Sequence, residues 1–378
     1  TPSNSSAASD VYKRQHRKRV LKRLEEQLHQ RPHTIEEIEK LLTSIDKTVE
    51  KWEEYINNLL DYPVTIVYLP RIDANDKEAL SQICMMFEKI NTTGVKLSVF
   101  DLLTARLYVY SIDLHKLWED ALEEYDNVKR LSEDNPDLTK VLILRALGLI
   151  RILRALEDNE QPEISDVKNR SLINLSHNGF KEDWWTVLSY FDSAIRRVMN
   201  TKDGFGAFTI KWIPYKAMLP VLATLLYYIE ELLDISKKAY AYATLKKWYW
   251  ASVFTERYSG SPENTALEDM KALIVSFNNE TVPSMINEAI DGVRKLNLEE
   301  IATSSSAIYK GIINLIALNG AKDFLKGDSI EFHELEDHHI FPAKYLQREL
   351  HITDKRLRNT ILNRTLISRE TNRFIRDK

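Results

Sequence analysis

Apolar residues that recur at steps of three and four positions dominate this chain, and that spacing is the period of an amphipathic helix. Thr34 and Glu37 have the spacing of a capping box, and an apolar stripe follows them as far as Leu59. A second stripe runs through residues 138–156 and ends at the helix-stopping residues 159–162. Only 10 Gly and 11 Pro occur in 378 residues, so few tight turns are expected. The sequence therefore predicts a mainly α-helical protein with one or two short strands.

Size, charge and cysteine content limit the class of protein. A chain of 378 residues exceeds the usual size of one domain, so we expect two or three domains. The net charge of −4 gives no overall basic field that would indicate nucleic acid. The single cysteine, Cys84, excludes a disulfide within the chain and lies in an apolar run typical of a core. No apolar window is long enough for a membrane span, so we expect a cytoplasmic protein without a membrane partner.

The region before residue 112 is expected to be mixed. Residues 63–70 are rich in β-branched side chains and lie between prolines, which predicts a strand. A helix over residues 75–90 follows, and Asn91 and Gly94 suit the turn that ends it. Ser98 has the position of an N-cap for the next helix. Asn91 and Gly94 are therefore interpreted as structural residues.

Reactive side chains cluster near the end of the chain. Asp337, His338 and His339 precede Ile-Phe-Pro, a pattern that suits a strand entering a tight loop. Asn363 opens a short apolar run, and Ser368 then begins a polar, helix-like tail that carries Asn372. This order predicts strand, loop, strand and helix, which is the layout of a ββα-metal nuclease site.

The residue types in this cluster suit phosphodiester cleavage. The reaction needs a base that takes a proton from water and a cation that stabilises charge on the phosphate oxygens. A neutral imidazole can act as the base. A divalent ion held by one His and one Asn or Asp keeps positions open for water and phosphate, so we expect Mg²⁺, with Mn²⁺ as the alternative. Two neighbouring histidines on their own are more commonly surface residues, and that interpretation stays open.

The block 338–378 resembles the HNH nuclease domain of GmrSD-type modification-dependent restriction endonucleases, whose relatives include BrxU and SspE. The resemblance rests on the strings His-His-Ile-Phe-Pro, Asn-x-Thr-Leu-Ile-Ser and Asn-x-x-Ile-x-x-Lys. It implies that His339 is the general base and that Asn363 orients this base and its loop. It also implies that His338 and Asn372 are metal ligands. Many such sites have Asp at the position of His338, so Asp337 is an alternative ligand.

Residues 87–102 resemble the closing part of the ParB-like N-terminal domain of the same family, where nucleotide binding is expected. The Asp-Gly-Gln-Gln-Arg string that marks the nucleotide site is absent here, and there is no P-loop. We therefore predict no nucleotide-binding residues and no NTPase activity. We also expect the chain to begin partway through that domain, after a non-native segment, and Lys378 to cut the final helix.

Basic residues are concentrated at the C-terminal end. Residues 355–378 contain eight Lys and Arg against Glu370 and Asp377, a local net charge of +6. We expect four of them to contact DNA phosphates, namely Arg364, Arg373, Arg376 and Lys378. The alternative is an ordinary solvated helix face. In the middle of the chain, the aromatic block around Trp248 and Tyr249 has the composition of a base-stacking surface but is interpreted as helix packing.

These observations predict a metal-dependent HNH endonuclease that cleaves DNA, modified or not, within a restriction or phage-defence system. The alternative is a non-catalytic helical adaptor that binds nucleic acid or a protein partner. The expected division of the chain is an unordered segment at 1–15, the end of a ParB-like domain at 16–112, a helical middle domain at 113–327 and an HNH domain at 328–378.

Overall fold

The computed structural model describes residues 34–63, 97–327 and 334–376, together with Lys18, Lys22 and Ile330. The chain forms two compact units, Thr1–Arg71 and Ile72–Lys378. In the first unit, helix α2 (Ile35–Leu60) begins at a capping box in which Thr34 and Glu37 satisfy each other's backbone N–H groups. This helix confirms the long helix that the apolar period predicts.

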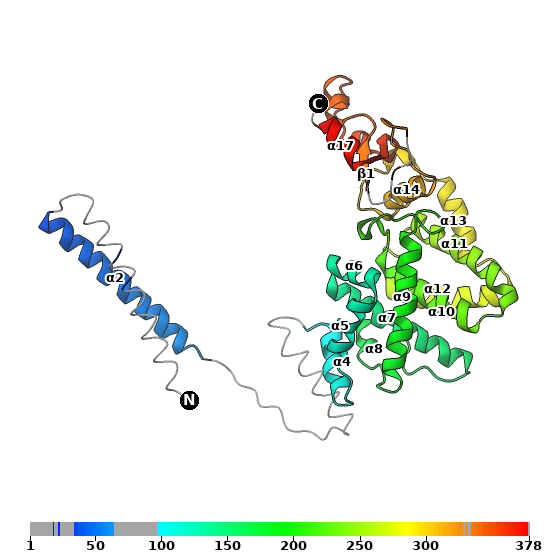
Figure 1. The fold of residues 1–378 in the computed structure, drawn as a ribbon, viewed down its shortest axis with the longest axis horizontal. Coiled ribbons are helices and arrows are strands. Elements are labelled where there is room, and N and C mark those ends of the chain that lie inside the picture. Colours follow the sequence, from blue (N-terminus) through cyan, green and yellow to red (C-terminus); the bar gives the residue numbers. More distant parts are fainter. Residues whose placement is uncertain are drawn as a thin grey trace. The chain divides into compact units, whose positions relative to one another are not determined.

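The second unit contains most of the helices, and Figure 1 shows their order by colour. Its helices are α4 (Val99–Tyr108), α5 (Leu114–Glu124), α6 (Asp126–Asp134), α7 (Pro136–Glu157), α8 (Asn169–Leu172), α9 (Phe180–Met199), α10 (Leu219–Tyr227), α11 (Lys238–Phe254), α12 (Pro262–Asn279), α13 (Ser284–Arg294), α14 (Ala307–Leu318), α15 (Ala343–Arg348), α16 (Lys355–Asn359) and α17 (Arg369–Arg376). Short 3-10 turns are η2 (Ile210–Trp212), η3 (Lys216–Met218), η5 (Ile235–Lys237), η6 (Leu298–Glu300) and η8 (Ile361–Asn363), and η4 (Tyr228–Leu232) is a π turn. The strands are β1 (Leu335–His339) and β2 (Arg364–Ser368). The described part of the chain is therefore mainly helical, as expected.

Helix α7 is the centre of the main core. It begins with Asn135, whose side chain accepts from the backbone N–H of Leu138, and with Pro136 at the first helical position. Its buried residues lie on nearly every side, as expected for a helix enclosed by others, and α4, α6, α8, α9 and α10 pack against it. Leu156, which the apolar stripe includes, is exposed because it lies in the last turn.

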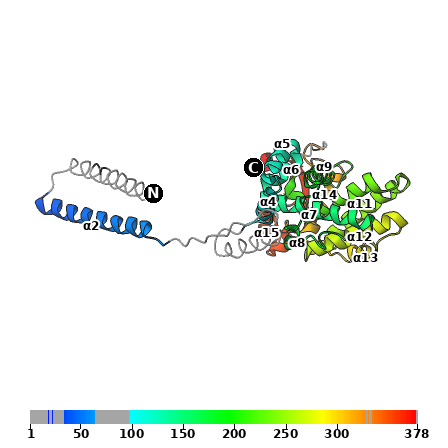
Figure 2. The same cartoon turned by 90° about the horizontal axis from the view of Figure 1, so that it is seen from below.

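The aromatic block of α11 belongs to the same core. Trp248 and Tyr249 are buried, so helix packing explains them. Trp248 donates a hydrogen bond of 2.8 Å to the fully buried Asp269 of α12. Helices α11, α12 and α13 lie together in both views of the ribbon (Figures 1 and 2). No helix within the described ranges combines the length and apolar character that crossing a membrane requires.

A second, smaller core joins helix α14 to the C-terminal hairpin. Ser306 caps α14 by accepting from the backbone N–H of Tyr309. Tyr309 and Ile313 of α14 are buried together with Leu335 of β1 and Leu366 of β2. Figure 1 shows α14 between this hairpin and helix α11. The hairpin is thus anchored on the helical body through α14.

Helices pack across two of the expected boundaries, and the expected division itself stays a prediction. Helix α4, placed before the boundary at 112, packs against α7 and α8 of the helical body. Its capping box of Ser98 and Asp101 confirms the helix start predicted there. Helix α14 shares its core with the hairpin, although the boundary at 327 separates them. Only Pro63 of the strand predicted at 63–70 is described. The helix predicted at 75–90 and Cys84 lie outside the described residues.

Candidate active site

The hairpin presents two different faces. Strands β1 and β2 pair antiparallel, with His338 opposite Thr365 and His339 opposite Arg364. Because successive side chains of a strand point to opposite faces, Asp337 and His339 share the face of the buried Leu335, which packs on α14. His338 lies on the other face, and helix α17 packs against both strands. The two neighbouring histidines therefore face different surroundings.

His339 has hydrogen bonds at both ring nitrogens. The guanidinium Nη1 of Arg364 lies 2.8 Å from Nδ1, and Oδ1 of Asn359 lies 2.9 Å from Nε2. A guanidinium only donates, so Nδ1 accepts and Nε2 carries the proton that it donates to Asn359. The amide of Asn359 is oriented in turn, because its Nδ2 donates to the carbonyl of Lys355. The imidazole is thus held as one neutral tautomer.

Asp337 holds the guanidinium of Arg364 that contacts His339. Its Oδ2 accepts from Nη2 of Arg364 at 2.9 Å and from the hydroxyl of Tyr309 at 2.8 Å. Burial raises the pKa of Tyr309 to about 12, with the neighbouring Asp337 carboxylate acting in the same direction and Arg364 opposing it. Tyr309 therefore stays protonated and donates. Oδ2 of Asp337 pairs with Arg364, whereas its Oδ1 is buried and has no hydrogen-bond partner among the described residues. The role of Asp337 as an alternative ligand stays a prediction.

Asn363 clamps the loop that follows the histidines. Its Oδ1 accepts from the backbone N–H of Phe341 at 2.8 Å, and its Nδ2 donates to the carbonyls of Phe341 and Arg358. The residue is buried, and its own carbonyl accepts from the backbone N–H of Ile340. Both ends of one amide therefore hold the loop directly after His339, and the role of Asn363 in orienting the base stays a prediction.

The face toward α17 carries His338 together with Glu336 and Asn372. Nδ2 of Asn372 donates to Oε2 of Glu336, while Oδ1 of Asn372 is buried and makes no hydrogen bond. A buried amide oxygen without a partner is uncommon, because desolvating it costs about 1–3 kcal/mol. A hard cation accepts such an oxygen as ligand. Within the described residues, no three His, Cys, Asp or Glu side chains gather as a metal site, so a cation here would need the amide.

Asp323 fixes the junction between β2 and α17, just before Asn372. Its carboxylate accepts from the backbone N–H groups of Ser368, Leu325 and Lys326 at 3.0 to 3.1 Å. Burial opposes its charge, but the hydrogen bonds from Ser368 and Lys326 prevail and hold the pKa of Asp323 well below its usual range. The charged carboxylate therefore ties the start of α17 to the loop after α14.

The four basic residues expected at DNA differ in their surroundings. Arg364 is mostly buried, and each of its guanidinium nitrogens already bonds to Tyr309, His339 or Asp337. Arg373 is exposed on α17. The side chain of Arg376 and the whole of Lys378 lie outside the described residues. The structure thus places Arg364 against the imidazole of His339, and phosphate contact stays a prediction for all four residues.

Several residues of this arrangement have no part in the sequence prediction. Glu336 precedes His338 by two positions, so the period of a strand would have placed it on the same face. No local pattern indicates Asn359 or Tyr309. Asn359 lies 20 positions after His339, and Tyr309 lies on a helix 28 positions before Asp337. Only the packing of α14 on the hairpin brings that hydroxyl to the site.

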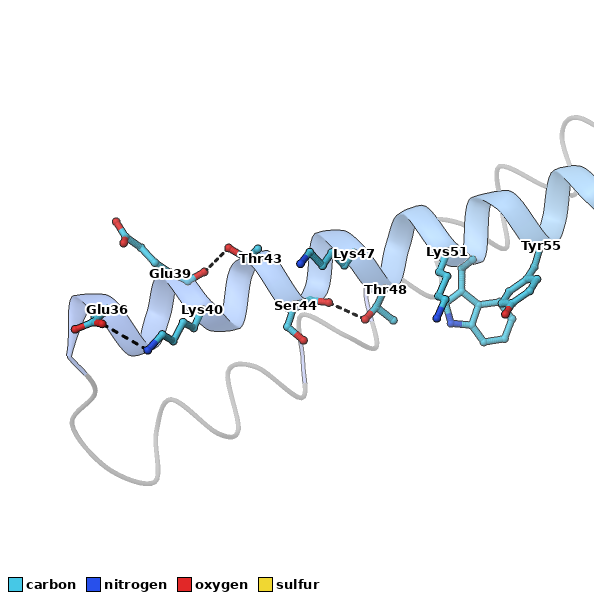
Figure 3. A pocket seen from close by; sticks show the side chains of 10 residues that line it. Glu36, Glu39, Lys40, Thr43, Ser44, Lys47, Thr48, Lys51 and Tyr55 are labelled. Carbon is cyan, nitrogen blue, oxygen red and sulfur yellow. Dashed lines mark hydrogen bonds and ion pairs between the residues drawn. The ribbon is translucent and has the colours of Figure 1, made fainter.

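Two hollows lie away from these residues. One, of about 810 Å³, runs along α2, where Glu36 pairs with Lys40 and the side chains of Thr43 and Thr48 donate to backbone carbonyls one turn earlier (Figure 3). The other, of about 430 Å³, lies beside the π turn η4 and includes Arg197 and Tyr242. Neither hollow is lined by a residue predicted for catalysis or metal binding.

Comparison with known proteins gives a relative without a stated activity. An uncharacterized protein of Methanocaldococcus jannaschii is 32% identical to this chain over 332 residues. The match covers 86% of this chain and 52% of the relative, so the chain spans about half the length of the curated relative that it matches. No protein-family model matches the chain. Most of this chain is therefore similar to about half of a longer protein, and the similarity assigns no function to it.

Proposed function

We propose that this chain is a metal-dependent endonuclease of the HNH type that cleaves DNA phosphodiester bonds. The observation that carries the proposal is the buried Oδ1 of Asn372, which has no hydrogen-bond partner on the face of the hairpin that also bears His338. The order of strand, clamped loop, strand and helix supports it, since this is the order that the resemblance to GmrSD-type restriction proteins implies. A place in restriction or phage defence rests on that resemblance alone.

The residues divide into two roles in this proposal. His338 and Asn372 would hold a divalent cation, Mg²⁺ or Mn²⁺, through an imidazole nitrogen and an amide oxygen. The cation would stabilise negative charge on the phosphate oxygens and the leaving oxygen. Asn363 keeps the loop after His339 in place, and Arg373 would contact a neighbouring phosphate. The exposed position of Arg373 on α17 suits that contact.

His339 would act as the general base after one contact opens. Because His338 points to the other face of β1, the water would have to reach Nδ1 around the end of the strand, where His339 is the last residue. In the resting arrangement the lone pair of Nδ1 accepts from Arg364, and Nε2 carries a proton. To take a proton from water, Nδ1 has to exchange the guanidinium of Arg364 for that water molecule. The hydrogen bond to Asn359 keeps the ring in the orientation that presents Nδ1.

The two hydrogen bonds of the His339 ring, with Arg364 and with Asn359, favour a second candidate function. If Arg364 never leaves Nδ1, His339 has no free lone pair and the hairpin is a structural element. The chain would then be a helical adaptor whose C-terminal basic residues bind nucleic acid. Such a protein would bind DNA with strong dependence on salt and none on divalent metal.

The test is nicking of supercoiled plasmid in Mg²⁺ or Mn²⁺. We expect His339→Ala to lower the rate by about 100-fold or more, because the base contributes about 10²- to 10⁴-fold. A matched control is His351→Asn, which removes another imidazole from the same region. Asn tolerates the positive φ of 55° at that position, and the side chain of His351 is exposed.

The control should nick DNA at the rate of the unchanged protein, and both variants should unfold at its temperature. Equal nicking by His339→Ala and the unchanged protein would remove His339 from the mechanism. DNA binding without any metal-dependent nicking would establish the adaptor instead.

A further inference from the structure

Glu336 is a charged side chain of the candidate site that the proposed mechanism does not use. It lies two positions before His338 on β1, so the two side chains point to the same face of the hairpin. Its side chain is partly buried, with 31% exposed. Across the gap between strand and helix, its Oε2 accepts a hydrogen bond from Nδ2 of Asn372. Glu336 therefore touches one proposed metal ligand and neighbours the other.

This contact decides which end of the Asn372 amide faces away from the strand. An ionised carboxylate has acceptors only, so it attracts the NH₂ end of the amide and repels the oxygen. The amide oxygen is consequently turned away from Glu336, into a buried position where it has no hydrogen-bond partner. Without the carboxylate, the amide could rotate by half a turn and present NH₂, which binds no cation.

No other described contact of the Asn372 side chain fixes the orientation of its amide. Oδ1 of Asn372 makes no hydrogen bond, so no donor in the described part of the chain holds it. Arg369 lies 3.3 Å from Oε1 of Glu336, and Arg369 is more than half exposed. This exposed pair fixes the carboxylate only weakly. The second oxygen of Glu336 remains engaged with Asn372, which is 5% exposed.

We propose that Glu336 is a positioning residue that orients the amide of Asn372 and so prepares its oxygen for a divalent cation. The inference rests on the proposed function, because it presumes that Asn372 is a metal ligand. Partners that orient a ligand in this way affect metal affinity by about 10- to 100-fold when they are removed.

Mn²⁺ binding to the full chain without DNA tests the proposal, measured by electron paramagnetic resonance of the free ion. Glu336→Leu keeps the volume of the side chain and Glu336→Ala does not, and both remove the acceptor. We expect each to raise the Kd for Mn²⁺ by about 10- to 100-fold. Glu336→Gln should recover most of the affinity, because its amide oxygen still accepts from Nδ2 of Asn372.

Controls separate this effect from loss of charge and from unfolding. Glu370→Ala removes a carboxylate from α17, the helix that carries Asn372, where Glu370 pairs with Lys326 at the surface, and should leave Mn²⁺ affinity unchanged. Thermal unfolding of every variant shows which of them are folded. Because Leu and Ala differ in volume, a folding defect in one variant leaves the other as the test.

The outcomes distinguish this inference from the proposed function. If the unchanged protein binds no Mn²⁺, or Asn372→Ala binds it equally well, the metal site fails and Glu336 has nothing to orient. If Asn372→Ala weakens binding while the Glu336 variants bind like the unchanged protein, only the orienting role fails. Affinity in Glu336→Gln as poor as in Glu336→Leu would show that charge matters and orientation does not, which also overturns the proposal.

Discussion

At the scale of single residues, the hairpin is built from polar side chains that hold one another in defined orientations. Arg364 selects the tautomer of His339, and Glu336 selects the orientation of Asn372. Each selection follows from a group that can only donate or only accept. The consequence is a site whose proposed base and proposed ligand are both oriented before any substrate arrives.

Asn363 is the residue whose replacement should disturb this order most. Asn363→Ala leaves the backbone N–H and C=O of Phe341 and the carbonyl of Arg358 without their buried partner. We expect the free energy of unfolding to fall by about 2–3 kcal/mol. If the proposed function holds, nicking should also fall by about 100-fold, because the loop after His339 loses its position. Urea denaturation and the plasmid assay measure the two effects.

Asn319→Ala is the matched control for that substitution. Asn319 is exposed and donates one hydrogen bond to the carbonyl of Leu315 at the end of α14. Its loss should change the free energy of unfolding by less than about 0.5 kcal/mol. A similar small change in Asn363→Ala would contradict the clamp.

At the scale of elements, α14 connects the hairpin to the helical body. One side of it carries Tyr309 to Asp337 and Arg364, and the other side approaches α11 closely. The close approach depends on Gly311. A Cβ atom at this position would lie 2.7 Å from Cγ1 of Val253, nearer than real contacts allow. The absence of a side chain at Gly311 therefore allows α14 and α11 to pack closely.

Gly311→Ala should destabilise the protein even though alanine favours a helix. The helical preference gains about 0.5–1 kcal/mol, while crowding in a packed core costs about 1–3 kcal/mol. We expect a net loss of about 1–2 kcal/mol in the free energy of unfolding, measured by urea denaturation.

Gly292→Ala in α13 isolates the helical preference. A Cβ atom there would meet only Cγ2 of Thr255, at an ordinary 3.7 Å. The variant should therefore be more stable than the unchanged protein by about 0.5–1 kcal/mol. If both alanine variants gain stability, α14 and α11 are not in the close contact described.

At the scale of the whole molecule, charge is unevenly distributed. The net charge is −4, yet residues 355–378 carry a local excess of basic residues. Helices form the large core, whereas the residues proposed for base, metal and phosphate contact lie on strand β1 and on α17, the last described helix. If the proposed function holds, DNA binding should depend on residues 355–378 of a chain that is otherwise acidic.

Arg373→Ala should reduce the salt dependence of DNA binding. Each phosphate contact contributes about 0.9 to the slope of log K against log salt concentration, so the magnitude of the slope should fall by about 0.9. Fluorescence anisotropy with a short duplex in the presence of EDTA measures it without cleavage. Arg170→Ala removes an exposed charge from α8 and should leave the slope unchanged. Equal slopes for all three proteins would show that Arg373 contacts no phosphate.

Local signals in the sequence predicted several of the described elements. The caps at Thr34 and Ser98 and the strand, loop, strand and helix order near the C-terminus follow from patterns within a few residues. Such patterns act through backbone hydrogen bonds and side-chain periods, which neighbouring residues satisfy by themselves. The functional assignment of the histidines and Asn372 remains a prediction.

The sequence by itself determined that the chain is mainly helical, where the hairpin lies, and which residue types it carries. Only the tertiary structure decided that Arg364 turns inward to His339, that Tyr309 reaches Asp337, and that Glu336 meets Asn372. Glu336 and Asn372 are 36 positions apart. The physical reason is that contacts across such distances depend on how α14 and α17 pack on the two faces of the hairpin, and no local pattern encodes that packing.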